Sequence, residues 1–145
     1  MDQTKSAGIA IESVHLLACT VGDVKREVDL KFSLGITHFS RALISDGKML
    51  AVTVSFDLMQ GIENPPCNFQ CTFAVTYTRP SEANMKWDEF KDHVAVAHIV
   101  PYVREFVSNI TTRLPLSVLM VPPVNTYKLL KEYQQLSFPS TTTPG

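Results

Sequence analysis

Two segments of this chain alternate between apolar and small or polar residues, and this alternation constrains the fold more than any other feature. Residues 50–58 carry an apolar side chain at every second position, and residues 69–77 repeat the pattern. Because successive side chains of a strand point to opposite faces, each segment predicts a half-buried antiparallel strand with one apolar face. A sheet of such strands needs a covering layer on one side only. The apolar positions are Leu50, Val52, Val54, Phe56, Leu58, Phe69, Cys71, Phe73, Val75 and Tyr77.

Two further strands are expected before these. Residues 28–36 alternate in the same way and predict the second strand of the sheet. Residues 9–19 alternate more loosely, and the apolar phase changes at Glu12-Ser13, which predicts a first strand with a bulge or bend at that point. Residues 45–48, Ser-Asp-Gly-Lys, are typical of a turn.

The period changes after the fourth strand. Apolar residues from Trp87 to Ala97 recur at three- and four-residue steps, which predicts a short helix. Pro101 suits the first turn of a new helix better than a helix interior, so we expect a break near Pro101. A second apolar stripe then runs to Leu114, and Pro115 ends the helix. The stripe consists of Val103, Phe106, Val107, Ile110 and Leu114.

The rest of the chain holds an apolar strip and a last helix. Leu116 to Val121 is apolar and is followed by two prolines, which favour an extended chain. Asn125 or Thr126 can cap a final helix that reaches Leu136. The predicted fold is therefore α+β, with a four-stranded antiparallel sheet, a long helix broken near the proline and a shorter C-terminal helix.

Length and composition indicate one folded domain with polar ends. We expect a single domain over residues 9–136, a disordered N-terminus over residues 1–8 and a disordered tail over residues 137–145. The formal net charge of -1 provides no basic field for a nucleic-acid backbone, and no apolar run reaches the roughly 18 residues of a membrane span. Three cysteines argue against a disulfide framework. Together these features predict a cytoplasmic protein without nucleic-acid binding or membrane insertion.

Side chains that could perform chemistry do not form a recognisable set. His93 and His98 are five residues apart, which does not place two ligands on one helix face, so we interpret them as ordinary surface or interface histidines. Cys67 and Cys71 have no second pair to complete a zinc site, and Cys71 shares the apolar phase of its strand, which predicts a buried thiol. We therefore expect no metal, no cofactor and no catalytic residues, that is, a binding protein and not an enzyme.

Two short motifs resemble the SecB family of protein-export chaperones. Residues 101–105, PYVRE, are similar to the sequence that begins the family's main helix, and residues 123–125, PVN, are similar to the sequence before its last helix. The expected order of four strands followed by helices is also that of the family. The resemblance covers about residues 9–136, and its specific part begins at Tyr102.

The resemblance implies a function and an assembly. SecB-like proteins are homotetramers, built as dimers of dimers, that hold unfolded polypeptides in apolar grooves without ATP. Some members pass preproteins to the translocase motor SecA, and others protect a single antitoxin. This chain is nearly neutral where classical members are acidic, and residues 17–23 lack their acidic, aromatic-flanked contact region, which argues against SecA as a partner. Thr126 replaces the aromatic residue that follows PVN in the family.

On this basis the sequence predicts two sets of site residues. The client-peptide groove would be formed by Leu116, Val118, Leu119, Met120, Val121, Tyr127, Leu130 and Tyr133. A fifth strand and internal packing are the alternatives for these residues. The oligomer interface would be formed by Tyr102, Val103, Phe106, Val107, Ile110 and Leu114, for which core packing against the sheet is the alternative.

Three functions are consistent with these features. The leading hypothesis is an ATP-independent holdase for preproteins or other aggregation-prone polypeptides. The second is a dedicated chaperone for one antitoxin-like client. The third is a structural or assembly oligomer whose apolar strip is only a contact between subunits.

Overall fold

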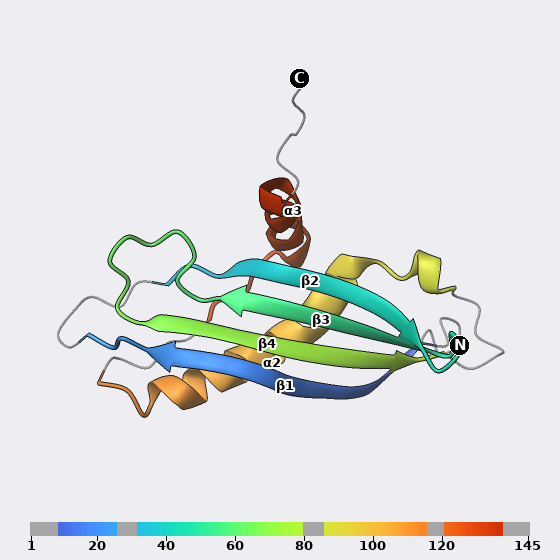
Figure 1. The fold of residues 1–145 in the computed structure, drawn as a ribbon, viewed down its shortest axis with the longest axis horizontal. Coiled ribbons are helices and arrows are strands. Elements are labelled where there is room, and N and C mark those ends of the chain that lie inside the picture. Colours follow the sequence, from blue (N-terminus) through green and yellow to red (C-terminus); the bar gives the residue numbers. More distant parts are fainter. Residues whose placement is uncertain (1–8, 26–31, 80–85, 116–120, 138–145) are drawn as a thin grey trace, which may run out of the picture.

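Four antiparallel strands form one sheet in this structure, a computed structural model that describes residues 9–25, 32–79, 86–115 and 121–137. The strands are followed by a short 3-10 turn and two helices (Figure 1). The elements are β1 (Ala10–Gly22), β2 (Gly35–Ile44), β3 (Met49–Asp57), β4 (Asn68–Thr78), η1 (Trp87–Glu89), α2 (Asp92–Thr111) and α3 (Thr126–Ser137). The order across the sheet is β1-β4-β3-β2. The predicted α+β fold is confirmed.

The apolar faces of β3 and β4 form the centre of the core. Every second residue of both strands is buried, from Leu50 to Phe56 and from Phe69 to Tyr77, as the alternation predicts. Small and polar side chains cover the opposite face. There Ser55 of β3 lies directly opposite Thr72 of β4, and their hydroxyl oxygens are 2.7 Å apart. The sheet therefore has one face to bury and one that tolerates water.

The predicted bulge in β1 is confirmed. The pairing of β1 with β4 shifts register between Ile11 and Ser13, which leaves Glu12 as the extra residue. A second shift lies between Leu16 and Ala18, and it was not predicted. The strand extends to Gly22, three residues beyond the expected range.

The prediction for the second strand is wrong in position. Residues 26–31 lie outside the described residues, and Ser33 makes only an isolated parallel bridge to Met59. β2 instead begins at Gly35 and forms a hairpin with β3 around the predicted turn, where Asp46 and Gly47 have positive φ angles. Because the turn sets the register of a hairpin, the position of β2 is determined by its distance from the turn. The apolar run that precedes β2 does not determine it.

The predicted break at Pro101 is absent, because α2 continues through this residue. Proline has no N–H to donate to the carbonyl of Ala97, and both residues are exposed, so water can satisfy that carbonyl. The helix ends at Thr111, before the predicted end at Pro115. The Thr111 and Thr112 hydroxyls donate to carbonyls of the preceding turn, which competes with helix continuation.

α2 crosses one face of the sheet and covers it (Figure 1). Its inward face buries seven residues, including Ile99, Val103 and Val107. The ring of Phe106 meets the rings of Phe69 and Phe73 edge-on, with centroids 6.1 and 6.0 Å away. This helix provides most of the covering layer that the alternation of the strands requires, and the buried Leu129 and Leu130 of α3 add to it.

Arg41 of β2 fastens the start of α2 to the sheet. Its guanidinium donates to the carbonyls of Trp87 and Phe90, each at 2.9 Å, and pairs with the carboxylate of Asp92. The Trp87 indole N–H in turn donates to the carbonyl of Gly47 in the β2–β3 turn. The connection between sheet and helix is therefore held by directed polar bonds as well as apolar contacts.

α3 packs against both α2 and β2. Asn125 caps it as predicted, because its side-chain oxygen accepts the backbone N–H of Lys128 at 3.0 Å. Ser137, placed in the tail by the prediction, is the last residue of α3, and the ranges 1–8 and 138–145 lie outside the described residues. No helix in the described part of the chain is long and apolar enough to cross a membrane.

Replacing Arg41 should lower stability measurably. Arg41→Ala leaves the carbonyls of Trp87 and Phe90 without this donor, and we expect the free energy of unfolding in urea to fall by about 1–3 kcal/mol. Lys128→Ala is the matched control, since it breaks an exposed pair with Glu132 and should change the value by less than about 0.5 kcal/mol. Equal stability of the Arg41→Ala and wild-type proteins would contradict the role assigned to Arg41.

Candidate polypeptide-binding site

The predicted groove residues fall into two groups in the structure. Leu116, Val118, Leu119 and Met120 lie outside the described residues. Val121 is 7% exposed and Leu130 is 5% exposed, and both belong to the hydrophobic core. The structure therefore places Val121 and Leu130 in the interior and not on an exposed groove wall.

The two tyrosines of α3 are placed differently from Leu130. Tyr133 is half-buried and packs against the core, whereas 57% of Tyr127 is exposed. The Tyr127 ring meets the His93 ring of α2 edge-on at 5.4 Å, and the Lys131 ammonium lies 5.6 Å from its centroid. Tyr127 thus presents an apolar ring to solvent at the junction of α3 and α2, held in place by its neighbours.

The predicted interface residues differ in exposure. Val103 and Val107 are fully buried, and Phe106 and Ile110 pack against the core, as the core-packing alternative describes. Leu114 is half-buried beyond the end of the helix. Tyr102 lies beside the buried stripe and is 44% exposed, so it is the exposed residue among these six.

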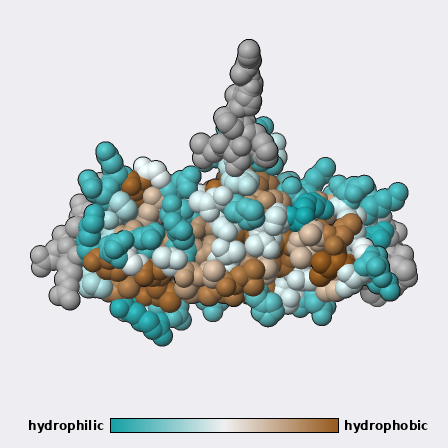
Figure 2. Space-filling view, viewed as in Figure 1, coloured by the Kyte–Doolittle hydropathy of each residue, from teal (hydrophilic) through white to brown (hydrophobic). Residues whose placement is uncertain are grey.

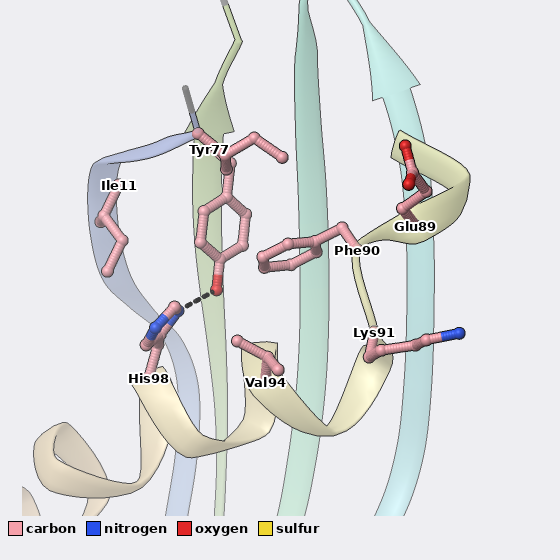
Figure 3. Close-up of a pocket in the computed structure, with 8 residues that line it drawn as sticks. Ile11, Tyr77, Glu89, Phe90, Lys91, Val94 and His98 are labelled. Atoms are coloured by element: carbon pink, nitrogen blue, oxygen red, sulfur yellow. Dashed lines mark hydrogen bonds between the residues drawn. The ribbon is translucent and has the colours of Figure 1, made fainter. Parts of the chain in front are cut away.

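Sequence reasoning missed an apolar pocket at the start of α2. It has a volume of about 300 Å³ and opens between the first residues of β1, the end of β4 and the first turns of α2 (Figure 3). Its apolar lining includes Ile9, Ile11 and Val94, with Glu89 and Lys91 at the side of η1. Because Ile11 lies opposite Tyr77 in the register, both side chains point to the face of the sheet that α2 covers.

One polar contact lies in this pocket. The Tyr77 hydroxyl and the His98 ring nitrogen Nδ1 are 2.7 Å apart, and the Tyr77 ring also packs against Phe90 at 4.6 Å (Figure 3). Burial lowers the pKa of His98 and raises the pKa of Tyr77, because both side chains lose the hydration of their charged forms. The pair is therefore neutral near pH 7.

The interpretation of His98 as an ordinary surface or interface histidine needs correction. His98 is half-buried and its ring is satisfied by Tyr77, which is 21 residues earlier in the sequence. The strand alternation places Tyr77 in the core, but no local pattern shows that α2 would bring His98 to it. The thiols of Cys67 and Cys71 are both buried, which confirms the prediction for Cys71.

The pocket and the exposed rings offer mainly apolar surface. The pocket is lined mainly by apolar side chains, and its one hydrogen-bonded pair is neutral and already satisfied. In the described part of the chain, no group of three His, Cys, Asp or Glu side chains could hold a metal ion. Apolar surface with few polar groups suits contact with apolar side chains of another molecule.

Comparison with known proteins identifies the fold. No family model matches the chain, and no curated protein matches it. Among solved structures, a SecB-like chaperone of Mycobacterium tuberculosis, in complex with a ChAD peptide from an antitoxin, matches with a TM-score of 0.61. The two chains are 21% identical, and the match covers 82% of this chain and 91% of the other. The predicted resemblance to SecB is confirmed at the level of the fold.

The Tyr77–His98 pair should make the fold sensitive to mild acid. The pKa of His98 is lowered in the folded protein, so the unfolded chain takes up this proton first as the pH falls. The contribution to stability is complete above about pH 6.5 and is lost as the pH falls from that value through the lower pKa of the folded state. The urea concentration at the unfolding midpoint should therefore decrease as the pH is lowered through this range.

Two variants separate His98 from other groups. His98→Gln should flatten this part of the pH profile, whereas His38→Gln, at an exposed position of β2, should retain it. A profile that is unchanged by His98→Gln would show that the Tyr77–His98 pair is not the source.

Proposed function

We propose that this chain is an ATP-independent holdase chaperone that binds unfolded polypeptides through apolar contacts. The observation that carries the proposal is the shared fold with a SecB-like chaperone that was solved with a peptide bound. The exposed apolar side chains of the described residues are consistent with it, since an unfolded chain offers apolar segments and not a defined shape. No ATP hydrolysis and no other catalysis is required, so the proposal describes a binding protein and not an enzyme.

The proposed client surface combines residues 116–120 with the exposed side of α3, and leaves out Val121 because it lies in the core. Apolar burial contributes about 25 cal/mol per Å², and ordering of the client chain opposes it, so capture needs several shallow contacts. Met120 suits such a surface because its side chain is flexible and polarizable. Tyr127 provides an exposed ring in the first turn of α3. Leu130 and Tyr133 attach the helix to the hydrophobic core.

Suppression of aggregation tests the function directly. A denatured client is diluted with and without the purified protein, without ATP, and light scattering of the aggregates is followed. A holdase should suppress the rise in scattering at stoichiometric amounts. A stable, folded protein that leaves aggregation of all clients unchanged would contradict a general holdase.

Single substitutions test the client surface. Leu119→Asp and Tyr127→Asp should each weaken binding of a labelled unfolded polypeptide about tenfold, because each replaces an apolar contact by a charge. Gln134→Asp is the matched control, since it places the same charge at an exposed polar position of α3. Leu130 is unsuitable for this test because a charge at a buried position would unfold the domain. Equal affinities of all three variants would exclude this surface.

A second candidate function is a dedicated chaperone for one antitoxin-like client. The observation that favours it is the antitoxin peptide bound to the structural neighbour. The nearly neutral charge of this chain agrees with it, and SecA is then not a required partner. Binding of a single co-expressed antitoxin, without suppression of aggregation of unrelated preproteins, would support this function over export. Absence of any polypeptide binding would leave the structural oligomer as the alternative.

We place the protein in the cytoplasm as a homotetramer, a dimer of dimers in which β1 provides one contact. Among the described strands β1 pairs only with β4, so its outer edge is free. Leu17 on this strand is 59% exposed, and hydrophobic residues gather along the β1 side of the sheet in Figure 2. A free apolar edge is prone to aggregation unless it is paired, whereas β2 at the other edge is contacted by α3. The exposed Tyr102 offers a further contact on α2.

Charged substitutions at the two edges test this assembly. Leu17→Lys should reduce the mass of the oligomer measured by light scattering. The substitution would bury an ammonium group in the contact between subunits, which destabilises that contact. Leu43→Lys on β2 is the matched control, since Leu43 is similarly exposed at 55% and should leave the mass unchanged. A mass that falls only with Leu43→Lys would assign the contact to the β2 edge instead.

A further inference from the structure

The register of β1 and β4 places two cysteines directly opposite each other. Cys19 pairs with Cys71 in the antiparallel ladder, so both side chains point to the same face of the sheet. Directly opposed residues in such a ladder have Cα atoms about 4.5–5.5 Å apart, and a disulfide spans Cα separations of about 4.4–6.8 Å. The backbone therefore already holds the pair at bonding separation.

The two thiols have different surroundings. Cys71 is 2% exposed and lies between Phe69 and Phe73, whose rings both meet Phe106 of α2. Cys19 is exposed at the outer strand. A reagent in solution can therefore reach the Cys19 sulfur, while α2 shields the Cys71 sulfur.

The third cysteine of the chain is not a competing partner for Cys71. Cys67 is buried and precedes β4 by one residue, four positions before Cys71. An extended chain rises about 3.3 Å per residue, so the two Cα atoms are about 13 Å apart, beyond the reach of a disulfide. Cys19 is thus the partner that the fold provides.

We propose that Cys19 and Cys71 are a redox modification site, which closes into a cross-strand disulfide when the folded protein meets a small-molecule disulfide such as oxidised glutathione. This inference is independent of the chaperone function proposed above. In a reducing compartment both residues remain thiols, as they are in the structure. The site would respond when that compartment becomes oxidising.

The reaction proceeds in two exchange steps. The Cys19 thiolate attacks one sulfur of oxidised glutathione, which breaks that disulfide, forms a mixed disulfide on Cys19 and releases one glutathione thiolate. The Cys71 thiolate then attacks the Cys19 sulfur and releases the second glutathione. The two cysteine protons end on the two released thiolates, so the protein loses two electrons and the reagent gains them.

The order of attack follows from burial. Desolvation by burial, with a smaller contribution from the neighbouring Cys19, raises the pKa of Cys71 to about 12, so Cys71 is rarely a thiolate near neutral pH. The exposed Cys19 therefore reacts first, and attack by Cys71 is the slow step. Closure would tie the free edge strand covalently to the centre of the sheet, and the exposed Cys19 sulfur would leave the bond open to reduction.

Oxidation of the folded full-length protein tests the proposal. The folded protein is first incubated with excess oxidised glutathione without denaturant. Remaining thiols, including the buried Cys67, are then blocked with iodoacetamide in urea, and intact mass and a non-reduced digest are measured. The expected product has lost two hydrogen atoms and carries one blocked thiol, and its digest contains a peptide pair joined through Cys19 and Cys71. Treatment with a reducing agent should restore the original mass.

Two single variants complete the test. Cys67→Ser should still form the bond and then carry no blocked thiol, whereas Cys19→Ser should form none. Both substitutions keep a side chain of similar size. Circular dichroism of each variant serves as the control for correct folding. A stable glutathione adduct on Cys19 as the main product, or a Cys19–Cys19 bond between two chains, would overturn the proposal.

Discussion

Burial of one face of the sheet beneath α2 is the interaction on which the rest of this structure depends. The alternate apolar side chains of β3 and β4 have almost no exposure, and they meet the buried stripe of α2 along its length. Removing this much apolar area from water is the largest favourable contribution that a domain of this size has. Because the cover lies on one face only, the other face of the sheet can carry small and polar side chains.

The position of α2 over the sheet is set at its beginning by polar contacts. Arg41 binds the carbonyls of Trp87 and Phe90 and the carboxylate of Asp92. Further along α2, His98 contacts the Tyr77 hydroxyl. Apolar contacts alone have little directional preference, whereas hydrogen bonds do. These bonds therefore determine the register in which the helix lies on the sheet, and the pocket beside Tyr77 results from that register.

A sheet with a single cover leaves edges and side surfaces free, and the proposed functions use them. The outer edge of β1 with Leu17 suits contact with a second copy, and the exposed Tyr127 of α3 suits contact with a client chain. The thiol pair joins the same edge strand to β4, so oxidation would act on the strand that the assembly uses.

Local patterns in the sequence determined the parts of the fold that depend on neighbours along the chain. Strand alternation predicted β3 and β4, the phase change at Glu12 predicted the bulge of β1, and Asn125 predicted the start of α3. These features follow from side-chain periodicity and backbone hydrogen bonding within a few residues. The SecB-like fold was suggested separately, by the resemblance of two short motifs to that family and by the order of the elements.

The tertiary structure alone decided the features that depend on distant partners. β2 lies after the apolar run that seemed to predict it, because its pairing with β3 is set by the turn between them. α2 continues through Pro101 because the unpaired carbonyl of Ala97 faces solvent, and His98 reaches Tyr77 only after the helix has packed. The opposition of Cys19 and Cys71 is likewise a property of the ladder. The periodicity of a segment indicates which of its faces is buried. Which other element covers that face depends on tertiary packing, and no local segment of the sequence specifies it.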